Sequence, residues 1–209
     1  MKYRVLIILM AAAIQAMAQF SSKSTYTLYS KNLQKEKAFW VSLPVDYEPS
    51  NTYPVIYLLD AEKRFETVLL ALAQQIEADL LKPCILVGVL NRGGQNERSL
   101  NFTFTASAFN RFGELYNPPV YDSTNAAGGT LFLSYLQDEL VPFIETKYAT
   151  APHKMLIGHS YSGYFATHIL TQNHSFTHYL ILDPSFWYDQ GALRKHLEVY
   201  QHSTKLKCK

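Results

Sequence analysis

Short runs of nearly continuous apolar residues recur along the chain. Such runs, when rich in β-branched and aromatic residues, predict strands that are buried on both faces of a sheet. Four of them occupy residues 53–60, 84–90, 154–158 and 178–183. An earlier segment, AFWVSLP, alternates between apolar and polar residues and predicts a strand that ends at Pro44.

Two longer segments carry apolar residues at helical spacing. The first covers residues 65–81 and ends before Pro83. The second covers residues 130–148, where Pro142 predicts a kink or a break after Val141. Because buried strands alternate with helices, we expect an α/β fold with a mostly parallel sheet, helices on both faces and right-handed crossovers.

Residues 91–127 fit neither pattern and are rich in Asn, Gly, Ser, Thr and aromatic residues. Loops of this length inside a compact domain are usually functional. This one follows the carboxyl end of a predicted strand, which is where open α/β sheets bind their ligands. We therefore expect residues 91–127 to form a wall of the binding pocket.

Composition narrows the classes of partner. The 209 residues suit one globular domain, with 48% hydrophobic residues to form its core. The formal net charge is only +2 and no run of Lys or Arg is present, so nothing indicates nucleic-acid binding. A small molecule or a protein is the expected partner.

The amino terminus predicts export. Lys2 and Arg4 precede an apolar run over residues 5–14 and an Ala-x-Ala pattern at residues 16–18, which is the form of a cleaved signal peptide. A membrane anchor is the alternative, but the run is shorter than the roughly 20 residues that span a bilayer. We expect a signal peptide over residues 1–18 and a periplasmic or secreted domain over residues 19–209.

Two cysteines make no disulfide framework. Cys84 lies in the apolar run CILVGVL, where a buried small hydrophobic residue is favoured over a disulfide partner of Cys208.

The segment LIGHSYSGYF places Ser160 where a predicted strand gives way to a helical pattern. This context is typical of a nucleophile elbow, in which small residues must stand two places before and two places after the serine. Gly158 satisfies the first requirement, whereas Ser162 occupies the second and Gly163 follows one place later. The alternative is a tight turn with a serine of no catalytic role. A nucleophilic Ser160 would need an oxyanion hole, and we expect its donors to be the backbone N–H groups of Tyr161 and Ala61.

Larger pieces of the sequence carry a family resemblance. They are YPVIYLLD, VGVLNR followed by ERSLNFT, GGTLFLSYLQDELVPFIETKY, LIGHSYSGYFA and LDPSFWY. In this order they resemble the esterase D and siderophore-esterase group of α/β hydrolases. The resemblance implies a three-layer α/β-hydrolase fold, a serine esterase activity without metal or organic cofactor, and a small-molecule ester as substrate. It also implies that Arg98 and Trp187 border the pocket, although Arg98 could equally form a loop-fixing ion pair and Trp187 could be a core aromatic.

The match departs from the family in three ways. Asn101 stands where the family usually has Asp, and Asp183 stands where a small residue is more usual before Pro184. In this fold the triad acid and histidine follow the seventh and eighth strands. The run over residues 178–183 corresponds to the sixth strand, so the resemblance implies that the hydrolase domain is truncated after it, with the tail TKLKCK as the opening of a seventh strand.

None of the seven histidines stands out as a base. His159 adjoins Ser160 but its side chain should point elsewhere, and His196 and His202 are expected to be solvated surface residues. The others are His153, His168, His174 and His178. We therefore expect the chain by itself to be a poor catalyst.

Three functional hypotheses follow. The first is an exported carboxylic ester hydrolase that forms an acyl-Ser160 intermediate, with siderophore, other small acyl or thiol esters (as in S-formylglutathione hydrolases) as substrates. The second is a binding module with an α/β-hydrolase-like fold and no turnover, or an inactive esterase. The third is acyl transfer through the same serine.

Overall fold

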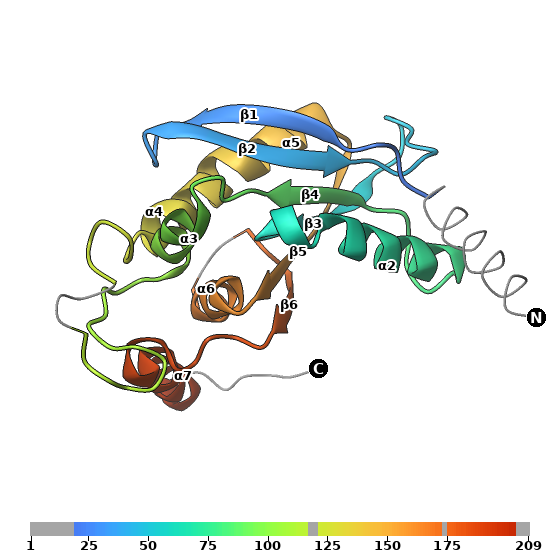
Figure 1. The fold of residues 1–209 in the computed structure, drawn as a ribbon. Helices are drawn as coiled ribbons and strands as arrows, with labels where there is room; N and C mark the ends of the chain where they lie inside the picture. The colour runs from blue at the N-terminus through green and yellow to red at the C-terminus, as the bar shows by residue number, and fades with distance from the viewer. Residues whose placement is uncertain (1–18, 117–120, 173–174, 204–209) are drawn as a thin grey trace, which may run out of the picture.

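A computed structural model describes residues 19–116, 121–172 and 175–203. The predicted signal peptide and the tail TKLKCK lie outside these residues. Within the described residues, six strands form one mixed sheet with the order β1-β2-β4-β3-β5-β6, in which β1 and β2 are antiparallel to their neighbours and the other four are parallel to one another (Figure 1). The strands are β1 (Ser24–Ser30), β2 (Lys35–Ser42), β3 (Tyr53–Leu58), β4 (Ile85–Val89), β5 (Thr150–His159) and β6 (His178–Leu182).

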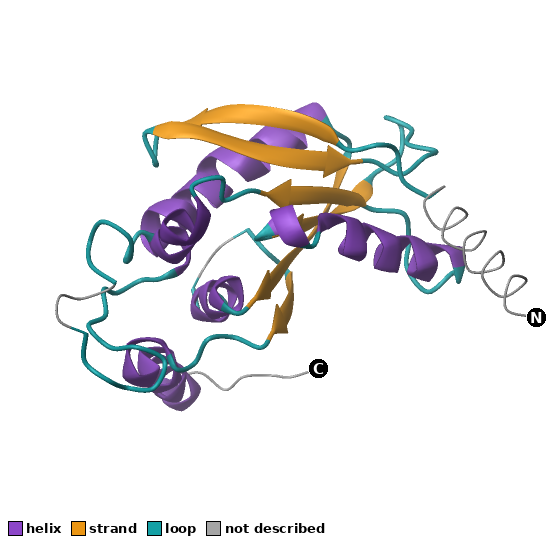
Figure 2. Ribbon diagram, in the orientation of Figure 1, coloured by secondary structure: helices purple, strands orange, loops and turns teal. Residues whose placement is uncertain are grey.

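Helices cover both faces of the sheet, as expected (Figure 2). On one face, α2 (Phe65–Glu77) packs Phe65, Leu69 and Ala73 against the strands. The other face carries α4 (Gly129–Ser134), α5 (Val141–Lys147) and α6 (Tyr161–Ile169) in a larger core cluster. The carboxyl-terminal α7 (Ala192–Ser203) follows the short η3 (Tyr188–Gly191) and contacts α6.

Three local predictions need correction. Strand β1 was not predicted, although STYTLYS alternates in the manner of a half-buried strand. Helix α3 (Gly94–Phe102), inside residues 91–127, was not predicted either, because it is mostly polar and shows no apolar periodicity. Finally, Pro142 does not break its helix: a π-helical segment, η2 (Tyr135–Leu140), joins α4 to α5 and ends just before the proline. The wider π-helical turn before Pro142 accommodates the proline ring and the absence of its N–H group.

Cys84 is buried and unpaired, as predicted. Burial raises the pKa of its thiol to about 12, so the residue is an inert part of the core. No helix in the described part of the chain has the length and apolar character needed to cross a membrane.

Strand β6 lies at one edge of the sheet and exposes an apolar face. Leu180 and Leu182 retain 44% and 45% of their surface, so the prediction that residues 178–183 form a strand buried on both faces is wrong. Strand edges without a partner, as this one is among the described residues, favour association with other chains.

Candidate active site

Ser160 occupies a sharp turn between β5 and α6, as the sequence predicted. Its backbone has φ 60° and ψ −116°, a conformation that residues other than glycine rarely adopt. The turn is tied to the end of β6 in both directions. The Ser160 N–H donates to Leu182 O at 3.1 Å, and the Ser185 N–H donates to Ser160 O at 3.1 Å.

Close backbone packing explains the glycines around this turn. A Cβ atom at Gly158 would lie 2.3 Å from the carbonyl oxygen of Ser162, so no side chain fits there. A Cβ atom at Gly163 would lie 3.0 Å from Leu182 O and 3.1 Å from Pro184 Cα. The second glycine of the motif is therefore needed where α6 passes the end of β6, one place later than the usual pattern.

Ser162 fits the position where the pattern prefers glycine because its hydroxyl group is fully engaged. Its Oγ accepts a hydrogen bond from the His159 N–H at 2.9 Å. The same oxygen lies 2.9 Å from His159 O and 3.1 Å from Asp60 Oδ2, and its single proton is directed to one of these acceptors. The side chain is completely buried. It thus connects the turn to the adjacent strand.

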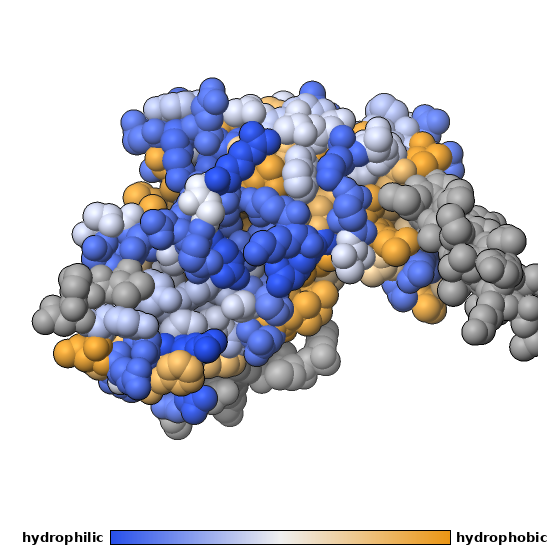
Figure 3. All heavy atoms as spheres, in the orientation of Figure 1, coloured by the Kyte–Doolittle hydropathy of each residue, from blue (hydrophilic) through white to orange (hydrophobic). Residues whose placement is uncertain are grey.

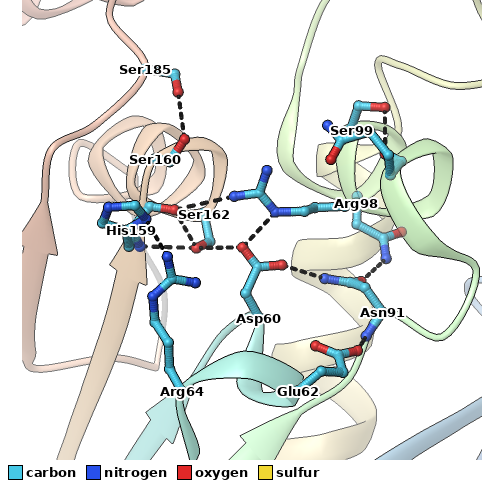
Figure 4. A network of polar contacts seen from close by, with 12 residues as sticks. Asp60, Glu62, Arg64, Asn91, Arg98, Ser99, His159, Ser160, Ser162 and Ser185 are labelled. Atoms are coloured by element: carbon cyan, nitrogen blue, oxygen red, sulfur yellow. Dashed lines mark hydrogen bonds and ion pairs between the residues drawn. The ribbon is translucent and has the colours of Figure 1, made fainter. Parts of the chain in front are cut away.

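Asp60 is the centre of a polar network that joins three strand ends (Figure 4). It follows β3 in a left-handed conformation and is only 6% exposed. Arg98 Nε donates to Asp60 Oδ2 at 2.7 Å, and Asn91 Nδ2 donates to Asp60 Oδ1 at 3.0 Å. Asn101 Nδ2 donates in turn to Asn91 Oδ1 at 2.8 Å, which gives a structural role to the asparagine that departs from the family pattern. Asp60 was not predicted as a site residue, although an aspartate directly after a buried strand was the available signal.

Arg98 and Trp187 have different places. Arg98 forms the ion pair with Asp60, lies 5.2 Å above the Tyr161 ring, and also lines the cavity at Ser160. Trp187 is half-buried and packs against the rings of Tyr161 and Tyr188, and it is not among the residues that line this cavity. A contact with substrate remains a prediction for both residues.

The helix that carries Arg98 is anchored by the neighbouring Glu97. Its carboxylate forms ion pairs with Lys35 at 2.8 Å and with the buried Lys37 at 2.7 Å, and it accepts the Gly93 N–H at 2.6 Å. Burial alone would raise the pKa of Glu97, but these hydrogen bonds lower it to about 2. Burial lowers the pKa of Lys37, and its bond to Glu97 offsets this only in part. The net gain from the cluster is therefore modest.

This lowered pKa predicts a dependence of stability on pH. Because the folded pKa of Glu97 lies below the unfolded value near 4.5, its contribution is complete above about pH 5 and is lost as pH falls toward 2. We expect about 1–2 kcal/mol of unfolding free energy to depend on this group, after allowance for the cost of burying Lys37. Urea unfolding at pH 6 and pH 3 measures the slope. Glu97→Gln should flatten it, whereas the exposed Glu198→Gln should not; equal slopes in both variants would refute the assignment.

The two predicted oxyanion donors differ in how closely they adjoin the serine. Tyr161 is the first residue of α6, so its N–H has no acceptor within the helix. Ala61 begins η1 (Ala61–Lys63) directly after Asp60, and its side chain is buried in the core beneath this turn. The oxyanion role stays a prediction for both.

The hydroxyl group of Ser160 lies within hydrogen-bond distance of another serine. Its Oγ lies 3.2 Å from the Oγ of Ser185, a buried residue in the loop after β6. Among the histidines whose side chains the structure describes, none forms a hydrogen bond with Ser160 Oγ. The described site therefore holds the candidate nucleophile without a base in contact with it.

The nearby histidines have other partners. Arg64 Nη2 donates to His159 Nδ1 at 3.0 Å. His168 and His196 stack with ring centres 4.5 Å apart, and His196 Nε2 lies 2.7 Å from Thr171 Oγ1. Burial, followed by the charge of His196, lowers the pKa of His168 to about 4. The expectation that His196 is a solvated surface residue is thus wrong, because the ring is half-buried between α6 and α7; the His202 side chain lies outside the described part.

A cavity of about 560 Å³ opens beside Ser160 at the carboxyl ends of β3, β4 and β5. Asn91, Arg92, Gly94, Gln95 and Arg98 line it, which confirms that the start of residues 91–127 forms a pocket wall. The remaining lining residues follow β3 or close β5: Asp60, Glu62, Lys63, Arg64, His159 and Ser160. The position agrees with the general rule for ligand sites in open α/β sheets.

Comparison with known proteins identifies the family. A family model described as "Putative esterase" matches residues 30–203. The chain belongs to this esterase family. It is 27% identical over 184 residues to the ferri-bacillibactin esterase BesA of Bacillus subtilis, and the match covers 84% of this chain and 63% of BesA.

Solved structures share the fold. An IroE-like serine hydrolase from Shewanella oneidensis superposes with a TM-score of 0.76 at 29% identity, covering 86% of this chain and 56% of that one. The BES protein from Bacillus cereus superposes with a TM-score of 0.74 at 29% identity, covering 88% and 70%. The predicted α/β-hydrolase fold is therefore correct, and the chain spans less than two thirds of the length of BesA and of the Shewanella protein.

Proposed function

We propose that this chain supplies the nucleophile and the pocket of a serine esterase that works through an acyl-Ser160 intermediate. The observation that carries the proposal is the strained Ser160 turn at the edge of a 560 Å³ cavity. Nucleophile elbows expose a serine hydroxyl above the sheet in this way. Membership of the esterase family supports the same conclusion.

The reaction would proceed in two steps. Ser160 Oγ attacks the ester carbonyl carbon while its proton passes to a base, and the resulting oxyanion is stabilised by the N–H groups of Tyr161 and Ala61. The C–O bond to the alcohol then breaks, and the alcohol leaves with a proton. In the second step water attacks the acyl-Ser160, which releases the acid and restores the serine hydroxyl.

Siderophore esters are the proposed substrates. BesA is named for ferri-bacillibactin, and this chain resembles it over 84% of its length. Other small acyl esters and thiol esters of the S-formylglutathione type use the same serine chemistry and are the alternatives. A binding module without turnover is the second candidate function, and it is favoured by the lack of a histidine in contact with Ser160 among the described side chains.

Covalent labelling tests the nucleophile directly. A fluorophosphonate should add one phosphonyl group to the purified protein, and peptide mass spectrometry should locate it on Ser160. The Ser160→Ala variant should remain unlabelled, while Ser134→Ala, on α4, should label like the parent. Because no base contacts Ser160 in the described structure, labelling should be slower than in an intact serine esterase. Labelling at another serine, or no labelling of Ser160 on prolonged exposure, would refute the nucleophile.

We also propose that the protein is exported. The support is the order of basic residues, apolar run and Ala-x-Ala in residues 1–18. Mass spectrometry of protein from the extracytoplasmic fraction should find an amino terminus near Gln19. Recovery of the protein with its first 18 residues from the cytosol alone would refute this proposal.

A further inference from the structure

Cationic side chains outnumber acidic ones around the cavity at Ser160. Among the described residues, Lys63, Arg64, Arg92 and Arg98 line it together with two carboxylates, those of Asp60 and Glu62. Hydrophilic side chains gather over α3 and the start of α2 on the face shown in Figure 3. The local excess of two positive charges around this one cavity equals the formal net charge of the whole chain, which is +2.

Both carboxylates already have partners within the protein. Asp60 accepts from Arg98 and Asn91, so its charge is balanced by Arg98. Glu62 accepts the backbone N–H of Asn91. The remaining cations are Lys63, Arg64 and Arg92, and none of them takes part in an ion pair within the described chain.

Arg64 is oriented before any ligand binds. It is half-buried, and its Nη2 donates to His159 Nδ1 at 3.0 Å. Because a guanidinium group only donates hydrogen bonds, His159 Nδ1 must carry a lone pair, and the neutral imidazole then carries its proton on Nε2. One donor of Arg64 is used in this bond, which leaves the rest of the planar fork available to an anion.

Arg92 lines the same cavity from a different element. It lies between β4 and α3, whereas Arg64 lies between η1 and α2. Its side chain is exposed and makes no ion pair within the described chain. A ligand that reaches Ser160 therefore enters a cavity with unneutralised guanidinium groups on two of its walls.

We propose that this cavity is selective for anionic esters, with Arg64 and Arg92 binding a negatively charged group of the substrate while its ester carbonyl lies at Ser160. The ester part of this inference rests on the proposed esterase function. The anion subsite rests only on the charges and contacts around the cavity. A neutral ester of the same size would leave the two guanidinium groups without a counter-charge.

Equilibrium binding separates the subsite from catalysis. In the Ser160→Ala protein no acyl-enzyme can form, so calorimetry can compare monobenzyl glutarate, which carries a carboxylate, with neutral benzyl methyl glutarate. We expect the anionic probe to bind about 10- to 100-fold more tightly. Raising the NaCl concentration from 50 to 500 mM should weaken binding of the anionic probe more than binding of the neutral one.

Substitutions then assign the preference to residues. Arg64→Gln and Arg92→Gln should each lower the affinity for the anionic probe by about tenfold and leave the affinity for the neutral probe nearly unchanged. Arg64→Lys should retain part of the preference, and the exposed Arg194→Gln on α7 serves as the control. Circular dichroism establishes that each variant is folded.

Two results would overturn the inference: equal affinity for the two probes, or an equal loss of both in Arg64→Gln, which would indicate a structural role. Failure of the proposed function has a different signature. In that case Ser160 would resist fluorophosphonate while the preference for the anionic probe persisted.

Discussion

The purified protein should hydrolyse 4-nitrophenyl acetate slowly, and Ser160→Ala should change this residual rate little. Ser160 has the backbone geometry of a nucleophile, but its hydroxyl contacts Ser185 rather than a histidine in the described structure. In well-studied serine proteases, removing triad members lowers turnover by about 10⁴- to 10⁶-fold and leaves the residual effect of binding and the oxyanion hole. We expect a deficit of that order relative to an intact esterase assayed in parallel.

Steady-state kinetics of the parent protein and of Ser160→Ala measure this deficit. The Ser134→Ala variant controls for the general effect of a serine substitution. Turnover equal to that of the intact esterase, lost in Ser160→Ala, would contradict the prediction and would mean that a base reaches Ser160 in solution. His196→Ala and His202→Ala would then be compared first. His196 already bonds to Thr171 and stacks on His168, so its release would require α7 to move away from α6.

The features that the sequence predicted well depend on local constraints. The turn at Ser160 is set by a preceding strand, a following helix and Gly158, all within a few residues of one another. Strands β3 and β4 were equally clear because parallel strands covered on both faces must be apolar throughout. The apolar run of β6 looked the same in the sequence but forms a half-exposed edge strand. These patterns do not depend on what the rest of the chain does.

The polar network at the site depends on contacts between distant residues. Asp60 meets Asn91, Arg98 and Ser162, which lie 31, 38 and 102 residues away in the sequence. No periodicity in the sequence records such a contact. The same holds for Arg64 and His159, 95 residues apart. It also holds for the mostly polar helix α3, where Glu97 pairs with Lys37 on β2 and Phe102 enters the core.

This network explains how a serine is tolerated at the second small position of the elbow. Asp60 receives Arg98 from α3 and lies within hydrogen-bond distance of Ser162 on α6, so one carboxylate connects the pocket wall to the nucleophile turn. A glycine at position 162 would leave the buried Asp60 oxygen with one contact fewer. The departure from the usual pattern is thus matched by a compensating partner just after β3.

Gly158→Ala should both destabilise the protein and prevent labelling of Ser160. The added methyl group would lie 2.3 Å from Ser162 O and 2.6 Å from Ser162 C. These atoms belong to the backbone of the first turn of α6, so no side-chain rotation can relieve the contact, and the turn itself must shift. We expect a loss of about 1–3 kcal/mol in the free energy of unfolding, with the Ser160 hydroxyl displaced from the cavity.

Urea unfolding and fluorophosphonate labelling measure the two effects. Gly113→Ala provides the control, because no atom lies within 4 Å of its added Cβ and only its positive φ is strained; it should cost less and should leave labelling intact. The double variant Gly158→Ala/Ser162→Gly should not recover, since the clash involves the Ser162 carbonyl rather than its side chain. Recovery in that double variant, or normal labelling in Gly158→Ala, would show that crowding at this turn does not control the position of Ser160.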